Sequence, residues 1–494
     1  MAEAANESGN LCVDRTPCLD LIAPRLSLAV TYVEADFAGP QRASQALRAG
    51  DNPPMGSDDL IMGARAARLI EAMEAMDRLV NWERRDRTED MGRSLEPVQD
   101  LLKQLGDPQS GPRFVHVAGT KGKGSVSSIV AAAISAAGVR CGCYASPHVE
   151  RVTERVRVDG EELDELALAA SLEASLEARE RAIAEGTAAA RATWFDLFTA
   201  GALRAFADSG CEWVVLECGL GGRLDSTNAV EGDVCVLTNV DLEHTSVLGD
   251  TLRQITLEKA AITPADGVLV IGLEEDDGEV CATAREVVAG VGGRARFLEE
   301  WPAHFDERNE ATARAVLHEV AAAGGPAGAA GVGREGLDAA RLKARSERFL
   351  LGQQEVILDG GHVASSVSGL LGQLEEGCTR TEAVLALGRE KDARAVLKAL
   401  AGHVDRLHCT TSTEGPLATG EDLARQGQEL EIDARDAGSP SEALEAALGG
   451  GAERVLVLGS FYLAGELRPL LVARAEASDA CSPSSQTSSS PTPS

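Results

Sequence analysis

A glycine- and lysine-rich stretch between an apolar run and a helical run has the composition of a phosphate-binding loop. It lies within "FVHVAGTKGKGSVSSIVAAAISAAG", residues 114–138. Glycines let the backbone turn several N–H groups inward, and the N-terminus of a following helix adds partial positive charge. Lysines could reach terminal phosphates, and the hydroxyl of Ser125 could approach a magnesium ion. The candidate phosphate-binding residues are Gly119, Thr120, Lys121, Gly122, Lys123, Gly124 and Ser125.

This stretch departs from the common pattern G-x-x-x-x-G-K-[ST]. Val117 stands five residues before Gly122, where that pattern has glycine, and the hydroxyl comes one place late, after Gly124. The alternative interpretation is a strand-to-helix turn rich in small residues that binds nothing. The loop by itself favours phosphate binding.

Lysine is scarce in this chain, with seven lysines among 47 basic residues. Where a positive charge is enough, arginine has been used, so each remaining lysine is a candidate for chemistry that a guanidinium cannot perform. Two lysines lie in the glycine-rich loop and another lies in "LEKAAI". The seven are Lys103, Lys121, Lys123, Lys259, Lys343, Lys391 and Lys398.

The elements that would position these residues alternate between β-rich and helical runs. From residue 113 onward, "RFVHVAG", "EWVVLECG", "DVCVLTNV" and "DGVLVIG" read as strands, each separated from the next by helix-like segments. After a linker-like stretch at 321–336, "QEVILDGG", "EAVLALG", "DRLHCTTS" and "ERVLVLGS" form a second set. This rhythm predicts an α/β protein with mostly parallel sheets.

The length of 494 residues predicts two domains and additional tails. We expect an N-terminal extension at 1–65, an ATP-binding domain at 66–335, a smaller domain at 336–474 and a Ser/Pro-rich tail at 475–494. A helical pattern also runs through residues 64–86.

Composition excludes several classes of function. A net charge of −31 disfavours nucleic acid as a partner, because phosphate neutralisation needs a basic face. No apolar run reaches the length of a membrane span. The N-terminus lacks the features of a secretory signal, and it is not the Arg-rich, acid-poor segment of a transit peptide. We expect a cytoplasmic protein with reduced cysteines, and a mitochondrial location is the alternative left open.

Several longer strings, in this order and spacing, resemble the folylpolyglutamate synthase and dihydrofolate synthase family, amide-forming ligases related to the Mur ligases. They are "YASPHVERVTERVRVDG", "TWFDLFTAGALRAF", "LECGLGGRLDSTNAV", "LTNVDLEHTSVLGDT" and "LRQITLEKAAI". The resemblance covers roughly residues 75–470. It implies an N-terminal P-loop ATPase domain with a mostly parallel sheet and a smaller, Rossmann-like C-terminal domain. It also implies that ATP activates a carboxylate as an acyl phosphate, which the amine of glutamate then attacks.

The resemblance also implies a metal site. Ser146, Glu217 and His244 match the family's magnesium ligands, although each alone reads as a structural residue. Two magnesium ions are implied, and a monovalent cation such as K⁺ is a further candidate. Lys259 matches a lysine that is carbamylated in the family, and the alternative is a helix-surface lysine in a salt bridge. The implied catalytic residues are Lys123, Lys259 and His244.

Asn309, near the end of the expected ATP-binding domain, and several residues of the smaller domain match the family's nucleotide site. The resemblance implies that Asn309 contacts adenine, Arg345 faces the ATP phosphates, Asp359 lies at the ribose, and His362 is the motif histidine. This chain departs from the family's pattern at Ala344, where glycine is usual, and at Gly361 and Val363 in "LDGGHV".

The carboxylate substrate is implied by residues that match the family's pterin site: Asp90, Met91, Gly92, Thr193, Leu224, Asp225 and Ser226. They favour dihydrofolate synthase, which adds glutamate to dihydropteroate, while a helix N-cap is the competing interpretation of Asp90. Three alternatives stay open: folylpolyglutamate synthase, a relative that binds nucleotide or folate without catalysis, and a simple phosphotransferase or NTPase. We expect a monomer whose partners are small molecules, with neither a nucleic acid nor a membrane among them.

Overall fold

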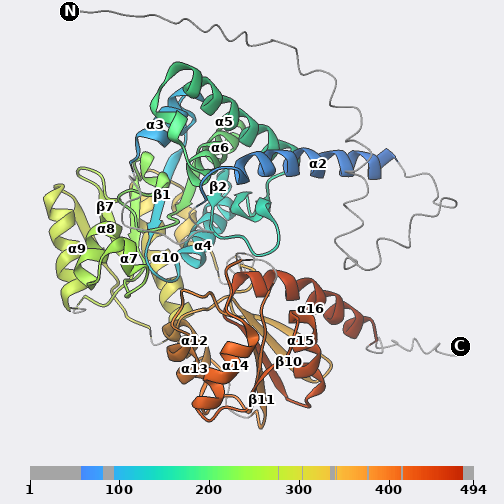
Figure 1. Cartoon of the computed structure of the whole chain (residues 1–494). Coiled ribbons are helices and arrows are strands. Elements are labelled where there is room, and N and C mark those ends of the chain that lie inside the picture. Colours follow the sequence, from blue (N-terminus) through green and yellow to red (C-terminus); the bar gives the residue numbers. More distant parts are fainter. Residues whose placement is uncertain are drawn as a thin grey trace, which may run out of the picture. The chain divides into compact units, whose positions relative to one another are not determined.

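The computed structural model describes residues 57–81, 94–275, 278–302, 304–333, 340, 342–374, 378–412 and 415–481 (Figure 1). The chain divides into two compact units, Met1–Met73 and Glu74–Ser494. Helix α2 (Ser57–Asp77) crosses this division. The helical pattern predicted through residue 86 was therefore wrong at its C-terminal end, since the helix stops at Asp77, and residues 82–86 lie outside the described ones.

An eight-stranded sheet occupies the first part of the second unit. Its order is β4-β3-β2-β5-β1-β6-β7-β8. The parallel strands are β1 (Arg113–Ala118), β2 (Cys141–Tyr144), β5 (Trp213–Glu217), β6 (Val234–Leu237), β7 (Val268–Ile271) and β8 (Arg294–Phe297). The antiparallel edge consists of β3 (Val156–Val158) and β4 (Glu161–Glu162). The central strands are almost continuously apolar, as expected for strands covered on both faces.

Helices cover this sheet. Those of the first part are α3 (Glu96–Gln104), α4 (Lys123–Ala136), α5 (Glu165–Glu185), α6 (Trp194–Asp208), α7 (Thr245–Leu248), α8 (Leu252–Ala260), α9 (Gly278–Gly290) and α10 (Phe305–Ala322). Helices α4 and α10 share one apolar core with β1, β5 and β6. Part of the linker-like stretch, the 3₁₀ turn η5 (Ala327–Gly331), packs on the same core through fully buried Ala329.

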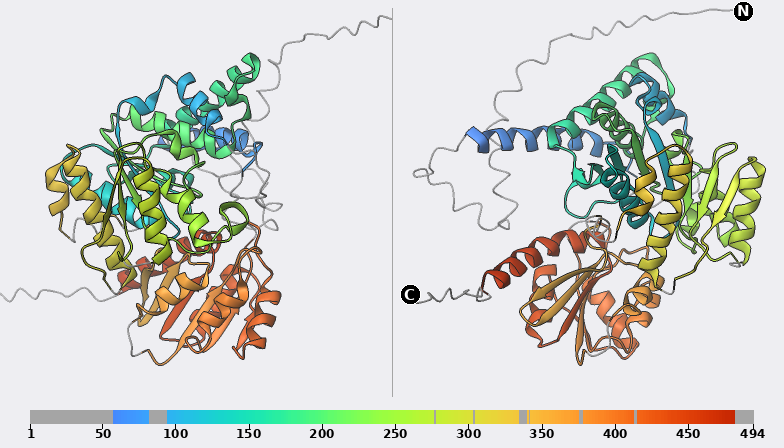
Figure 2. Two further views of the ribbon diagram at one scale, coloured as in Figure 1. Left: turned by 90° about the vertical axis from the view of Figure 1, so that its left-hand side faces the viewer. Right: turned by 180° about the vertical axis from the view of Figure 1, so that it is seen from behind.

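A six-stranded sheet follows, in the order β13-β12-β11-β14-β10-β9. Its strands are β9 (Glu347–Leu351), β10 (Gln354–Asp359), β11 (Thr381–Leu385), β12 (Arg406–Cys409), β13 (Ala434–Asp436) and β14 (Arg454–Leu458), and only β9 runs antiparallel to its neighbour. Helices α12 (Ala364–Leu371), α13 (Ala393–Leu400) and α14 (Gly420–Glu429) share one core with the sheet, whereas α15 (Pro440–Gly449) and α16 (Phe461–Cys481) share another (Figure 2). The α/β class predicted from the sequence is confirmed.

The strands β1, β5 and β6 end side by side, because all three are parallel neighbours. The ends of these strands therefore bring three features to one edge of the sheet. They are the glycine-rich loop after Ala118, the side chain of Glu217 at the end of β5, and the segment after Leu237. Ligands of α/β proteins bind at such an edge. Among the described residues, no helix has the length and apolar character needed to cross a membrane.

Candidate functional site

The glycine-rich loop takes a conformation that depends on glycine at two positions. Gly119 has φ +153° and Gly122 has φ +79°, both unfavourable for residues with a side chain. A Cβ at Gly119 would overlap the hydroxyl of Thr238, and one at Gly122 would overlap the side-chain amide of Asn309. Helix α4 begins at Lys123, so Lys123 occupies its first turn.

The segment after β6 holds the loop by its backbone. The amide of Lys121 donates to Asn239 Oδ1 (2.8 Å), and its carbonyl accepts from Asn239 Nδ2 (3.0 Å) and from Thr238 Oγ1 (2.6 Å). The amide of Asp241 donates to Thr120 Oγ1 (3.1 Å). Sequence reasoning missed these residues, although they lie in the quoted string "LTNVDLEHT".

Two lysines donate to one carbonyl of the loop. Lys123 Nζ lies 3.1 Å and Lys259 Nζ 2.9 Å from the oxygen of Gly119. Lys259 is only 5% exposed, which contradicts the alternative of a surface lysine. Burial, together with the charge of Lys123, lowers the pKa of Lys259 to about 7. Much of its amine is therefore neutral near neutral pH.

A half-buried carboxylate gathers three cationic or titratable groups beside the loop. Glu243 lies 3.2 Å from Lys121 Nζ, 3.5 Å from His362 Nε2 and 3.8 Å from Lys391 Nζ. Burial would raise the pKa of Glu243, but the hydrogen bond with His362 and the charge of Lys121 outweigh it and hold the pKa well below its usual range. Burial lowers the pKa of His362, so a neutral imidazole is favoured. Neither Glu243 nor Lys391 was predicted as a site residue.

The expected metal ligands are only partly assembled. Glu217 is 3% exposed and its Oε2 accepts from the backbone amide of Ser146 at 3.2 Å. Burial raises the pKa of Glu217, and Lys123 and Arg345 oppose that effect only partly. His244 is exposed at the start of α7, with φ +53°. Throughout the described ranges, no three His, Cys, Asp or Glu side chains converge as a metal site. Glu217 nevertheless fits a divalent cation, because such a charge would offset the cost of burying an anionic oxygen.

The residues predicted to contact the nucleotide lie near the loop or in the second sheet. Asn309, on α10, is 5% exposed and packs against Gly122, and its buried Nδ2 has no hydrogen-bond partner among the described residues. Asp359 ends β10 and accepts from the amides of Ser346 (2.7 Å) and Gly361 (2.6 Å). The guanidinium of Arg345 stacks 4.5 Å from the centre of the Phe461 ring.

Of the predicted pterin-site residues, Asp90, Met91 and Gly92 lie outside the described residues. Two others converge on the carboxylate of Asp196: Thr193 Oγ1 donates at 2.8 Å and Ser226 Oγ at 2.6 Å. Asp196, 7% exposed, was missed, although the spacing Thr193-x-x-Asp196 is that of a helix capping box.

Asp225 and Leu224 belong to the loop after β5. Asp225 is buried and accepts from the amide of Leu220 (2.8 Å) and from Thr227 Oγ1 (2.5 Å), so its carboxylate shapes this loop. Burial raises its pKa against those hydrogen bonds. Leu224, which lies between Leu220 and Thr227 in the sequence, is half-buried.

Comparisons with known proteins give one group of relatives, while no protein-family model matches the chain. A probable bifunctional folylpolyglutamate synthase/dihydropteroate synthase of Haloferax volcanii is 43% identical over 196 residues, 40% of this chain and 23% of the relative. This chain therefore spans less than a quarter of that relative's length. The dihydrofolate synthase/folylpolyglutamate synthase of Escherichia coli is 32% identical over 413 residues, 78% of this chain and 93% of the relative.

Solved structures agree. E. coli FolC in complex with DHPP and ADP has 28% sequence identity and a TM-score of 0.69, over 83% of this chain and 99% of the other. A bifunctional folylpolyglutamate synthase/dihydrofolate synthase with Mn, AMPPNP and L-glutamate bound has 28% identity and a TM-score of 0.68, over 81% and 98%. Since the relative from E. coli is above 30% identical and is covered over 93% of its length, this chain belongs to the dihydrofolate synthase/folylpolyglutamate synthase family.

Proposed function

We propose that this chain is an ATP-dependent ligase that joins L-glutamate to the carboxylate of 7,8-dihydropteroate, forming dihydrofolate, ADP and phosphate in folate metabolism. One observation carries the proposal. In a chain of net charge −31, four of the seven lysines gather at the phosphate loop: Lys123 and Lys259 on the Gly119 carbonyl, Lys121 and Lys391 on Glu243. Such a local concentration of cations fits a polyphosphate ligand.

The reaction needs charge neutralisation more than covalent help. A carboxylate is a poor electrophile, so its oxygen first takes the γ-phosphoryl group of ATP, and ADP leaves. The amine of glutamate then attacks the acyl carbon of the acyl phosphate, phosphate leaves, and the nitrogen loses a proton. Several anions must come together in the first step, and fixed cations lower the barrier. Lys123, in the first turn of α4, is placed to balance charge on the transferring group.

A divalent metal fits this site, as judged from the buried Glu217. We propose that Ser146, Glu217 and His244 would hold Mg²⁺, of which two ions are expected, with K⁺ as a further candidate. The metal would supply positive charge to the phosphate oxygens. Magnesium prefers hard oxygen ligands, which Ser146 and Glu217 offer.

Lys259 is proposed to carry a carbamate. Its neutral amine would attack carbon dioxide, form the N–C bond and release a proton, leaving a carboxylate where the sequence has an amine. The burial of Lys259 and its pKa of about 7 support this step, because only a neutral amine reacts.

The nucleotide assignments are proposals of the same kind. The unpartnered Nδ2 of Asn309 is a donor available to adenine, and Arg345 supplies charge to the phosphates. The carboxylate of Asp359 would lie on the ribose side, and His362, hydrogen-bonded through Nδ1 to the Gly360 carbonyl (2.9 Å), would serve the same region.

Extension of folates with further glutamates is the second candidate function. The relatives favour it, because several of them carry both activities in their names. Thr193 and Ser226, which both donate to Asp196, favour ligation to dihydropteroate. They would give the acceptor a polar, buried surface at the position of the predicted pterin site. The loop that contains Leu224 and Asp225, together with Asp90, Met91 and Gly92, is proposed to complete it.

The test is a comparison of acceptors. Purified protein is incubated with ATP, magnesium and glutamate, together with either dihydropteroate or a tetrahydrofolate, and the product is identified by mass spectrometry. Glutamate added to dihydropteroate supports the proposal, and addition only to the tetrahydrofolate would replace it by the second candidate. ADP release that needs neither acceptor nor glutamate would show a simple NTPase. Lys123→Ala is the control: removing the cation should slow ligation by about 100-fold or more while the thermal transition stays normal.

A further inference from the structure

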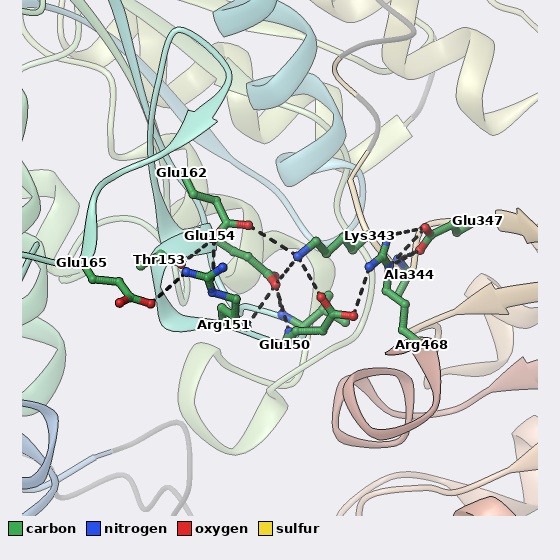
Figure 3. A network of polar contacts seen from close by, with 11 residues as sticks. Glu150, Arg151, Thr153, Glu154, Glu162, Glu165, Lys343, Ala344, Glu347 and Arg468 are labelled. Atoms are coloured by element: carbon green, nitrogen blue, oxygen red, sulfur yellow. Dashed lines mark hydrogen bonds and ion pairs between the residues drawn. The ribbon is translucent and has the colours of Figure 1, made fainter. Parts of the chain in front are cut away.

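An ion-pair network links the segment after Ser146 to the turn that precedes β9 (Figure 3). Lys343 Nζ lies 2.9 Å from both Glu150 and Glu154 and 3.4 Å from Glu162. Glu150 also pairs with Arg468 of α16 (3.0 Å). We define this set, Lys343 with its three glutamates and Arg468, as the Lys343 network. It joins residues that are 181 to 318 positions apart in the chain.

On one side, the Lys343 network fixes the segment that begins at Ser146. Glu154 accepts the backbone amides of Val149 (2.7 Å) and Glu150 (3.0 Å), so this segment folds around one carboxylate. Helix α16 also comes close to it, because a Cβ at Gly465 would overlap the Val149 carbonyl. Burial would raise the pKa of Glu154, but these amides and Lys343 hold it below its ordinary value.

On the other side, the network fixes the turn 342–346. Glu347 accepts from the amide of Ala344 (3.0 Å) and pairs with Arg468 (2.7 Å). Ala344 and Ser346 both have positive φ, +51° and +49°, which costs conformational energy in residues with side chains. Only surrounding contacts can maintain such a turn. Arg345 stands between these two residues.

The same turn reaches the proposed metal ligand. A Cβ at Gly124 would lie 3.0 Å from Leu342 Cδ1 and 3.3 Å from Glu217 Oε2, so Leu342 and the carboxylate flank one glycine. Neither Lys343 nor Glu150 touches the phosphate loop in the contacts that the structure describes.

We propose that Lys343 is a positioning residue that fixes the turn 342–346, and with it Arg345, relative to the segment that begins at Ser146. The ion pairs of Lys343 hold the strained turn next to the segment that begins at Ser146. The guanidinium of Arg345 and the proposed metal ligand Ser146 therefore keep a fixed position relative to each other. This inference deepens the proposed function, and its kinetic readout rests on that function. Because a misplaced catalytic group slows a reaction steeply, loss of Lys343 should slow ligation without unfolding the protein.

The first experiment compares Lys343→Met with Lys398→Met, the same substitution at an exposed lysine of α13. Lys343→Met should lower kcat about 10- to 100-fold, with a smaller change in the KM of the acceptor. Lys398→Met should stay within about twofold of wild type. Lys343→Arg, which keeps the charge, should restore most of the rate. A rate for Lys343→Met equal to that of Lys398→Met would overturn the inference.

A second set of variants asks whether Lys343 acts through Arg345. Adding Lys343→Met to Arg345→Ala should slow ligation little further, because the group to be positioned is already gone. Full additivity of the two losses would overturn the inference and leave Lys343 a general stabilising residue.

Hydrogen exchange gives a readout that needs no ligand or activity. In Lys343→Met, the amides of the turn 342–346 and of residues 146–154 should exchange faster than in wild type and in Lys398→Met, while the six-stranded sheet stays protected. Unchanged exchange in both segments would overturn the inference. A wild-type protein that ligates no acceptor would refute the proposed function, and the exchange comparison would still decide the role of Lys343.

Discussion

At the scale of single residues, the environment of each side chain explains more than its type. Lys259 and Lys343 are both lysines, yet burial lowers the pKa of the first to about 7, while Glu150 and Glu154 overcome burial and raise the pKa of the second. The first is therefore suited to covalent chemistry and the second to a permanent charge.

The chemistry proposed for Lys259 has a pH dependence that can be measured. With a pKa of about 7, the amine changes from mostly protonated at pH 6 to mostly neutral at pH 8. In ¹³C-bicarbonate, a carbamate signal should grow over this range and be absent from Lys259→Met. Lys259→Arg should lose activity although it keeps the charge, because a guanidinium does not deprotonate in proteins. An active Lys259→Arg enzyme without a carbamate signal in the wild type would refute the assignment.

A second residue-scale prediction separates metal binding from folding. Glu217→Gln keeps the shape and removes the charge, so the magnesium concentration for half-maximal activity should rise at least about tenfold. Because burial raises the pKa of Glu217, its charge opposes folding, and the variant should melt no lower than wild type. An unchanged magnesium titration would make Glu217 a structural residue.

Among the elements, the glycine-rich loop depends on a neighbouring segment for its shape. Parallel pairing of β1 with β6 brings Thr238 and Asn239 next to the loop, and their side chains satisfy the backbone of Lys121. Gly119 and Gly122 can adopt the positive φ angles of this loop, and the hydrogen bonds from the segment after β6 stabilise that conformation.

Asn239→Ala should therefore weaken binding of an ATP analogue. The substitution leaves the amide of Lys121 without its partner, which costs about 1–3 kcal/mol, or roughly 5- to 150-fold in affinity. The matched control is Gln354→Ala, which removes a side-chain amide that donates to the Ala452 carbonyl (2.7 Å) in the six-stranded sheet. Calorimetric titration checks both. Equal affinities in the two variants would show that the loop keeps its shape without Asn239.

At the scale of the whole molecule, charge is distributed unevenly. The chain is strongly acidic, but cations gather at the phosphate loop, and several glutamates form ion pairs within the protein. Glu154 and Glu243 both have lowered pKa values, although burial acts in the opposite direction. They therefore stabilise the fold above their unfolded pKa near 4.5, and this contribution is lost as the pH falls through the lower folded values.

Glu154→Gln tests this at one position. At pH 7 the variant should lose about 1–3 kcal/mol of unfolding free energy, because a charged acceptor of three backbone amides and of Lys343 is removed. The difference from wild type should shrink below pH 4.5, where the wild-type carboxyl also takes up a proton. Urea unfolding between pH 7 and pH 3 measures it, with Glu161→Gln, an exposed glutamate of β4, as control. A difference that does not change with pH would exclude ionisation of Glu154 as its source.

The local features of this protein can be predicted from its sequence. The alternation of apolar strands and helices predicts the parallel sheets, because burial on both faces needs continuous apolar runs. The glycines and lysines of residues 119–124 predict the phosphate loop, and the order of the longer strings predicts the family. The division into domains at residues 65, 335 and 474 stays a prediction.

The pairing of residues that are distant in the sequence could not be predicted and is known from the fold alone. Glu243 lies beside Lys121, 122 positions away, and beside Lys391, which stands between β11 and α13. Asp196 accepts from Thr193 and from Ser226, which is 30 positions away. Lys343 pairs with Glu150 across 193 positions. The partner of a charged or hydroxyl side chain depends on which strands and helices the fold places beside it. The pKa of that side chain depends in turn on its burial and on those neighbours. These partners are products of sheet topology and packing, which local patterns do not specify.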